Sequence, residues 1–245
     1  MQKYFINENI ELNKSFKIES SDQHHIEKVM RNKNGDQIIC VDLKHIQYLC
    51  LIENVQEGTI LPIEKLDINN ELDVEVTLVY ALPKGDKFEF VLQKACELGV
   101  HHIPLSSKRC VVKLTKDKFN KKLPRYQKIL KEASEQSGRN RIPSIEEVKT
   151  IKELKPYLKD YNLVAYEETA KQHEHGELFH TLQQLKAGDQ LLIIVGCEGG
   201  FDESEIQELN EMGVKCCSLG NRILRSETAP LYLMSVIGYS RELTK

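Results

Sequence analysis

Val195-Gly196-Cys197-Glu198-Gly199-Gly200-Phe201 is the stretch of sequence that decides the fold. A second stretch of the same kind follows further along the chain, Leu219-Gly220-Asn221-Arg222-Ile223-Leu224-Arg225-Ser226-Glu227-Thr228-Ala229. Each is a glycine-bearing turn that follows an apolar, strand-like run and precedes a predicted helix. Glycine has no Cβ, so the backbone of such a turn can approach a small ligand closely. Two turns of this kind so near each other in sequence predict a single ligand site.

Strands and helices alternate on both sides of these turns. The pattern predicts strands over 74–82, 162–166, 190–195 and 214–219, and helices over 84–99, 124–138, 177–186 and 228–243, with a further helix starting at Asp202. Asp202-x-x-Glu205 has the spacing of a capping box, and Pro124 is taken as a first-turn residue of its helix. The run 190–195 is wholly apolar after its first residue, as in strands covered on both faces of a parallel sheet. Residues 73–245 are therefore expected to form an α/β domain with a mostly parallel sheet.

Residues 1–70 have a different pattern. Short apolar runs at 38–42, 48–52 and 59–63 are separated by turn-forming residues and predict strands. One short helix is expected over 22–30, with Asp22 as its N-cap. Several short strands at close spacing are typical of a small β-barrel. The stretch 66–72 is the expected linker to the α/β domain.

Composition excludes several classes of protein. The chain has 245 residues, 40% of them hydrophobic, and no apolar run long enough to span a membrane. Residues 1–8 lack the apolar core of a signal peptide. The seven cysteines are odd in number and form no Cys-x-x-Cys pair, which argues against a disulfide framework and a zinc site. We therefore expect a cytoplasmic protein.

A basic block lies inside a chain whose net charge is only −3. Residues 108–131 hold ten Lys or Arg and one acid, Asp117, and Arg139 and Arg141 follow. Such a block can neutralise the phosphates of a nucleic acid. It is equally compatible with a solvated helix face and a lysine-rich loop. Charge alone leaves both interpretations open.

The chemistry-bearing residues gather in the second glycine turn. Arg222, Arg225 and Glu227 lie beside the apolar Ile223 and Leu224, and charges so placed either pair with one another or face a ligand. The following helix presents a positive dipole end that favours an anionic group. Neither turn matches a Rossmann or P-loop motif.

Two other sets of residues suggest chemistry only weakly. His173, His175 and His180 lie in or near a polar stretch without a further ligand at a fixed offset, so no metal is expected. Cys197 has no histidine in a recognisable partner motif, so a cysteine nucleophile is not expected.

Several blocks in order resemble one family. They are Lys84–Lys87, Gln93–Val100, Glu132–Arg139, Ile142-Pro143 and the two glycine turns, with His24–Arg31 matching more loosely. Together they resemble the 16S ribosomal RNA uracil-N3 methyltransferases, over most of the chain from residue 84 onward.

The resemblance implies a fold, a cofactor and partners. It implies a SPOUT-type α/β domain with a C-terminal trefoil knot, a PUA-like RNA-binding β-barrel before it, and a homodimer. The implied cofactor is S-adenosylmethionine, and the implied substrate is a uridine of 16S rRNA, or of the small subunit, near the decoding centre.

The resemblance also implies roles for particular residues. Arg225, with Arg222 second, would stabilise negative charge on the uracil, and Glu227 would orient the arginine or accept the N3 proton. The cofactor would contact Tyr166, Glu167, Val195, Gly196, Glu198, Gly199, Leu219, Gly220, Ile223, Leu224 and Thr228. RNA phosphates would contact Arg31, Lys84, Lys87, Arg109 and Arg139.

The chain departs from the family pattern at three positions. Cys197 stands where a proline is usual, which predicts a looser first turn. Tyr126 stands where tryptophan is common, and Pro230 where another small residue is usual. Two alternatives stay open, namely an RNA-binding protein of the same fold that has lost activity, and a methyltransferase of this fold that acts on another RNA position.

Overall fold

The computed structural model describes residues 1–105, 110, 115–147, 150–171 and 176–244. Contacts divide the chain into two compact units. The N-terminal unit comprises Met1–Glu71 and Ser134–Ile142, and the C-terminal unit comprises Leu72–Ala133 and Pro143–Lys245. The expected domains, 1–70 and 73–245, assigned 134–142 to the second domain, whereas these residues contact the first unit.

The N-terminal unit is built on a five-stranded sheet in the order β1-β3-β4-β5-β2. Strand β1 runs parallel to β3, and the other pairs are antiparallel. The bounds are β1 Lys3–Phe5, β2 Phe16–Lys17, β3 Gln37–Val41, β4 Gln47–Asn54 and β5 Thr59–Leu66. The three strands predicted here are confirmed, and their alternating residues Ile38, Cys40, Cys50, Ile52 and Ile60 fill the core.

The helix of this unit begins earlier than predicted. It comprises α1, Ser20–His24, and a π-helical turn η1, His25–Val29. Glu19 occupies the N-cap position, so Asp22 as N-cap was wrong. Asp22 lies in the first turn and is buried, and an acidic residue there complements the positive end of the helix dipole.

The C-terminal unit contains a five-stranded sheet in the order β10-β8-β9-β6-β7, and every pair in it is parallel. The predicted α/β class with a parallel sheet is confirmed. The strands are β6 Glu75–Ala81, β7 Val100–Leu105, β8 Tyr161–Ala165, β9 Gln190–Val195 and β10 Lys215–Cys217. The helices are α2 Lys87–Glu97, α3 Lys116–Ser137, η2 Ile151–Tyr157, α4 Glu167–Lys171, α5 Glu177–Gln184, α6 Glu203–Glu211, α7 Thr228–Gly238 and η3 Tyr239–Leu243.

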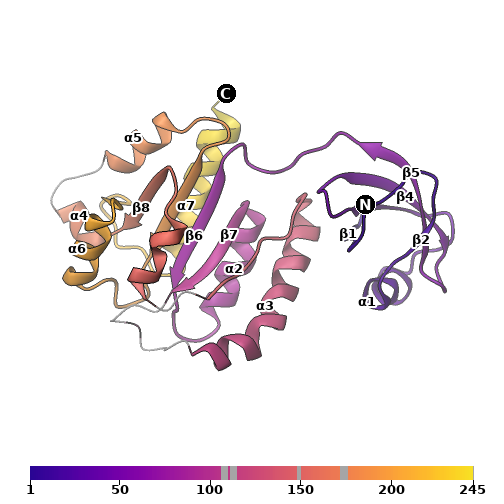
Figure 1. Ribbon diagram of the computed structural model, residues 1–245, viewed down its shortest axis with the longest axis horizontal. Coiled ribbons are helices and arrows are strands. Elements are labelled where there is room, and N and C mark those ends of the chain that lie inside the picture. The colour runs from indigo at the N-terminus through magenta and orange to yellow at the C-terminus, as the bar shows by residue number, and fades with distance from the viewer. Residues whose placement is uncertain (106–109, 111–114, 148–149, 172–175, 245) are drawn as a thin grey trace. The chain divides into compact units, whose positions relative to one another are not determined.

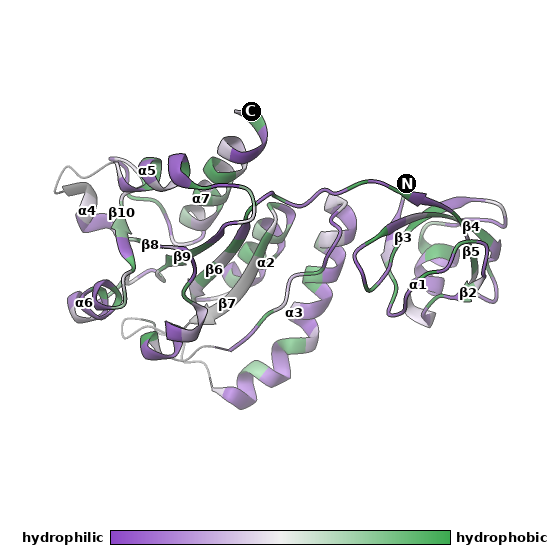
Figure 2. Cartoon of the chain, turned by 45° about the horizontal axis from the view of Figure 1, so that its top comes forward, coloured by the Kyte–Doolittle hydropathy of each residue, from purple (hydrophilic) through white to green (hydrophobic). Residues whose placement is uncertain are grey.

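Helices cover both faces of this sheet (Figure 1). On one face, Val79, Val164 and Ile194 pack against η2 and α6. Residues that alternate with these along the strands face α2 and α7, which contact each other. In Figure 2 the strand β9 is green over most of its length, as expected for a strand buried on both faces.

The capping box at the start of α6 is present as predicted. The Asp202 carboxylate accepts a hydrogen bond from the Ser204 N–H at 3.0 Å, and the Asp202 N–H donates to Glu205 at 2.7 Å. These bonds fix where the chain leaves the first glycine turn and enters the helix.

Helix α3 also begins earlier than predicted, and Pro124 lies inside it. The Thr115 hydroxyl accepts a hydrogen bond from the Lys118 N–H at 3.3 Å at the helix start. An interior proline removes one backbone hydrogen bond. The helix continues through it because a single apolar stripe is buried on both sides, namely Phe119 before the proline and Tyr126, Leu130 and Ala133 after it. Tyr126, which stands where tryptophan is common, packs on Phe88 of α2 with ring centroids 5.2 Å apart.

Candidate functional site

A pocket of about 1060 Å³ lies where β8, β9 and β10 end. These strands are neighbours in the sheet. Because they run parallel, their carboxyl ends meet at one edge, where open α/β sheets bind ligands. The pocket is lined by three segments that follow the strands, 165–168, 195–201 and 219–226, together with Lys87, Glu203 and Ala229.

The predicted residues gather in this pocket almost completely. Those that line it are Tyr166, Glu167, Val195, Gly196, Glu198, Gly199, Leu219, Gly220, Arg222, Ile223, Leu224 and Arg225. Two predicted residues stand apart from the lining. Thr228 is exposed at the start of α7. Glu227 reaches the pocket through an ion pair with Lys87.

Two glycines shape the pocket in opposite ways. A Cβ on Gly196 would lie 3.1 Å from the Gly200 Cα and 3.2 Å from the Phe201 ring, so this position admits no side chain without a shift. Gly220 has a φ of 97°, a conformation that other residues rarely adopt, and a Cβ there would meet nothing within 4 Å. Gly196 therefore packs the first turn tightly, whereas Gly220 borders open space.

The first turn is closed although Cys197 replaces the usual proline. The Gly200 N–H donates to the Cys197 carbonyl at 2.9 Å, and the Cys197 side chain is buried beside Ala81 and Cys110. Burial of the Cys197 side chain and the Gly200–Cys197 hydrogen bond thus restrain the backbone of the first turn, which a proline would restrain through its fixed φ.

Arg222 and Arg225 are exposed at the pocket. Among the described residues, no carboxylate lies within ion-pair distance of either guanidinium. The Arg225 carbonyl accepts hydrogen bonds from the N–H groups of Thr228 and Ala229, at 2.9 and 3.0 Å, which fastens the arginine's backbone to the start of α7. The anchored backbone and the unpaired charge suit these residues to an anionic group.

Lys87 lies in the pocket, although the expectation from the sequence was that it contacts an RNA phosphate. Its Nζ lies 3.0 Å from Glu198 Oε1 and 3.0 Å from Glu227 Oε2. The Lys84 N–H also donates to Glu198, at 3.3 Å, and the Ser226 hydroxyl donates to Glu227 at 3.1 Å. The local sequence places Lys87 just beyond the carboxyl end of β6, but the partners lie 111 and 140 residues further on, which is why sequence reasoning missed the contact.

The electrostatics of this cluster keep all three groups charged. Hydrogen bonds to Glu198 and then to Glu227 raise the pKa of Lys87. The backbone N–H of Glu227 lowers the pKa of its own carboxyl more than burial raises it, and Lys87 lowers it further. Burial raises the pKa of Glu198, but hydrogen bonds from its own backbone, from Lys87 and from Lys84 together outweigh it.

The remaining predicted RNA contacts have separate outcomes. Arg139 is 3% exposed, and its guanidinium is bound by Glu71, with 2.6 Å between Nη2 and Oε2, so burial argues against a phosphate contact. Arg31 and Lys84 are exposed and stay predictions. Arg109 lies outside the described residues.

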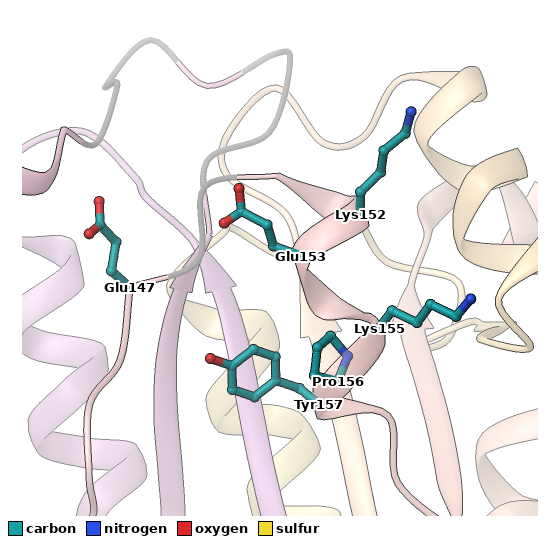
Figure 3. A pocket seen from close by; sticks show the side chains of 6 residues that line it. All are labelled: Glu147, Lys152, Glu153, Lys155, Pro156 and Tyr157. Carbon is teal, nitrogen blue, oxygen red and sulfur yellow. The ribbon is translucent and has the colours of Figure 1, made fainter.

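A second pocket of about 640 Å³ lies beside η2. It contains none of the predicted site residues. Figure 3 shows the ammonium groups of Lys152 and Lys155 pointing away from the carboxylates of Glu147 and Glu153, so these charges do not converge on a ligand.

In the described part of the chain, no group of three or more His, Cys, Asp and Glu residues is arranged to hold a metal ion, and His173 and His175 fall outside that part. No helix within the described ranges is long and apolar enough to cross a membrane.

Comparison with known proteins gives matches over the full chain. Residues 70–238 match the model of an RNA methyltransferase domain, and residues 18–61 match that of an RNA methyltransferase PUA domain. The ribosomal RNA small subunit methyltransferase E of Bacillus subtilis is 42% identical over 100% of this chain and 99% of its own. The protein of the same name from Mesomycoplasma hyopneumoniae is 35% identical, covering 96% of this chain and 98% of its own.

A solved structure agrees with these matches. The ribosomal RNA small subunit methyltransferase E of Neisseria gonorrhoeae, bound to S-adenosyl methionine, has a TM-score of 0.85 and 27% identity, with 97% of each chain covered. The two domain matches, the full-length relatives and the shared fold lead to one conclusion. This chain belongs to the RNA methyltransferase family that includes the ribosomal RNA small subunit methyltransferases E.

Proposed function

We propose that this chain transfers a methyl group from S-adenosylmethionine to N3 of one uridine in 16S rRNA. The observation that carries the proposal is the pocket at the ends of β8, β9 and β10, with two unpaired arginines at its edge and an ionised carboxylate, Glu227, beside it. Membership of the RNA methyltransferase family supports the reaction class, and the resemblance in the glycine turns supports the N3 position.

The residues of the pocket suit this cofactor. A volume of about 1060 Å³ is ample for a nucleoside with an amino-acid chain and leaves room for an approaching base. The open space beside Gly220 would accept a flat ring, and the Ile223 side chain, 79% exposed, would cover one face of it. Backbone groups of residues 219–224 would hydrogen-bond the adenine, while Tyr166, Gly196 and Glu198 border the rest of the ligand. When bound, the cofactor would supply an electrophilic methyl group.

Arg225 would stabilise charge on the uracil. The N3 proton must leave before that nitrogen can attack, and negative charge then spreads to the ring carbonyl oxygens. A guanidinium that is already in place stabilises such charge without reorganisation. Arg225 is unpaired among the described residues and anchored to α7, and Arg222 lies three residues before it.

Glu227 would accept the N3 proton. Its carboxylate stays ionised because its own backbone N–H and Lys87 lower its pKa. The other role suggested for Glu227, orienting Arg225, is not supported, because the described partners of the Glu227 carboxylate are Lys87 and Ser226. A positioned base of this kind contributes about 10²- to 10⁴-fold to a proton-transfer step.

The target base has to leave its stack to reach the pocket, at a cost of a few kcal/mol. Phosphate contacts would offset that cost. Arg31 and Lys84, which are exposed, and Arg109 are the proposed contacts.

We also propose that the enzyme acts in the cytoplasm as a homodimer with a knotted C-terminal domain, as the family resemblance implies. Apolar side chains exposed on α7 and η3 support the dimer, with Tyr232 39%, Tyr239 61% and Leu243 74% exposed. Sedimentation equilibrium of the chain and of Tyr239→Glu would test it. A chain that sediments as a monomer at micromolar concentration would rule it out.

The decisive test of the function is nucleoside analysis. Small ribosomal subunits from a strain lacking this gene are incubated with the purified chain and labelled cofactor, and the RNA is digested and analysed by mass spectrometry. We expect the label in 3-methyluridine at one site. Label in a 2′-O-methyl or other base product would establish a different position. No transfer combined with retained RNA binding would indicate an inactive RNA-binding protein.

A further inference from the structure

Lys87 joins two carboxylates that come from separate loops of the pocket. Glu198 belongs to the turn after β9, and Glu227 immediately precedes α7. The Lys87 Nζ lies 3.0 Å from an oxygen of each. An ammonium group has three donors, so these two contacts use most of its hydrogen-bonding capacity.

We propose that Lys87 is a positioning residue, which ties Glu227 to Glu198 and so holds the Glu227 carboxylate where it accepts the proton from the substrate. The proposal rests on the proposed function, because it assigns Lys87 a task in that reaction. It replaces the phosphate contact expected from the sequence.

The second donor to each carboxylate shows what Lys87 adds. The Lys84 N–H binds Glu198 and the Ser226 hydroxyl binds Glu227, but each of these donors bonds to only one of the two carboxylates. Lys87 alone, among the described residues, bonds to both. Loss of its ammonium would leave two carboxylates facing each other without the cation between them, and their repulsion would drive Glu227 away from its place.

Charge argues against a phosphate at this position. One ammonium and two carboxylates carry a net charge of −1, and the pocket lining adds Glu167, Glu168 and Glu203. A phosphate approaching Lys87 would be repelled by both partners at once. Arg222 and Arg225, which lack carboxylate partners in the described chain, offer a better place for an anion.

The test uses the full chain and a double-mutant cycle. Lys87→Met, Glu227→Gln and the double variant are assayed with methylation-deficient small subunits. We expect Lys87→Met to lower kcat by about 10²-fold, the effect of a misplaced catalytic group. The KM for the subunit and its dependence on salt should stay unchanged. Lys87→Arg should restore most of kcat. The double variant should be no slower than Glu227→Gln alone, because Lys87 acts through Glu227.

Lys94→Met is the matched control. Lys94 also lies on α2 and is similarly exposed, with an ion pair of 2.8 Å to Glu97. Its loss should leave kcat and cofactor affinity unchanged. Circular dichroism of each variant checks that α2 is folded.

A measurement without turnover keeps this inference separate from the proposed function. Carbon NMR of the glutamate carboxyls should show the Glu227 pKa rising in Lys87→Met and staying low in Lys87→Arg. An unchanged Glu227 titration would overturn the inference, even in an active enzyme. The inference would also be overturned if the losses of kcat in the two single variants multiplied in the double variant. It would likewise be overturned if Lys87→Met weakened RNA binding and reduced the dependence of log affinity on log salt by about one. Absence of methyl transfer by the wild-type chain would refute the proposed function, while the titration would still decide the coupling.

Discussion

Replacing Arg139 by methionine should destabilise the N-terminal unit strongly while leaving RNA binding intact. The Arg139 guanidinium donates through Nε and Nη2 to Glu71, and the same carboxylate accepts the N–H groups of Asn140 and Arg141 at 2.8 and 3.2 Å. The two side chains are 3% and 11% exposed. Methionine keeps most of the apolar volume and removes the charge, so Glu71 is left buried without its counter-ion.

The size of the effect follows from this burial. Removing one partner of a buried ion pair costs about 3–5 kcal/mol. An exposed pair contributes about 1 kcal/mol or less. Arg125→Met supplies the control, because Arg125 is 69% exposed although its Nη2 lies 2.6 Å from Glu89 Oε2. The two pairs have the same closest distance, so the comparison sets a buried, multiply bonded pair against an exposed one.

Hydrogen exchange measured by mass spectrometry reports the unit separately from the rest of the chain. Peptides covering β3 to β5 should exchange about 10²- to 5 × 10³-fold faster in Arg139→Met, if these amides open with the whole unit. Arg125→Met should leave them unchanged. Unaltered exchange in Arg139→Met, together with weaker RNA binding and a smaller salt slope, would refute the reasoning and restore the phosphate contact.

Three other perturbations probe the pocket and the N-terminal unit. Arg225→Ala should lower the rate of methyl transfer by about 10²- to 10³-fold, as loss of a preorganised charge does. Calorimetry should find its cofactor affinity within a few-fold of the wild type, and equal losses of both would make Arg225 a binding residue instead. Gly220→Val should abolish cofactor binding, because valine strains a φ of 97° and fills the open space; an unaltered calorimetric affinity would move the pocket elsewhere. Burial lowers the pKa of Lys3 to about 8, so between pH 8 and 10 the unfolded chain binds more protons at Lys3 than the folded chain does. Stability should therefore rise with pH over that window by more in the wild type than in Lys3→Met, and parallel unfolding curves for the two would contradict the lowered pKa.

The architecture of the C-terminal unit could be predicted because its cues are local. An apolar run such as 190–195 reports burial on both faces, and a glycine turn after it marks the carboxyl end of a strand. Parallel strands bring such ends together, so one ligand site at the two turns could be expected from the pattern, whereas Tyr166 and Glu167 were assigned to it only by the family resemblance. The start of α3 could not be predicted in the same way. Pro124 suits the first turn of a helix and was taken as its start, but burial of Phe119 and Tyr126 on one stripe extends the helix to residues before the proline.

The contacts of charged side chains could not be predicted either, because the sequence shows which residues are charged but not which residues they pair with. Arg139 and Lys87 were both expected to contact RNA phosphates. The partner of Arg139 lies 68 residues away, and one partner of Lys87 lies 111 residues away. No local pattern joins such pairs. Because Arg139 is buried and Lys87 lies between two carboxylates, we propose that neither contacts a phosphate.

The pairing of Glu227 explains why the arginines of the second turn remain available. Glu227 lies two residues after Arg225, and the sequence left open whether these opposite charges pair with each other or face a ligand. In the structure the Glu227 carboxylate is bound by Lys87 and Ser226, from α2 and from its own turn. In the proposed reaction, Arg225 would keep its charge for the ligand, and one pocket would present a carboxylate to accept the N3 proton beside a guanidinium to stabilise the anion that remains. Deprotonation of N3 would require both functions at once, and a direct Arg225–Glu227 ion pair would weaken both. By binding Glu227, Lys87 would keep these two functions apart, although it lies outside the second turn.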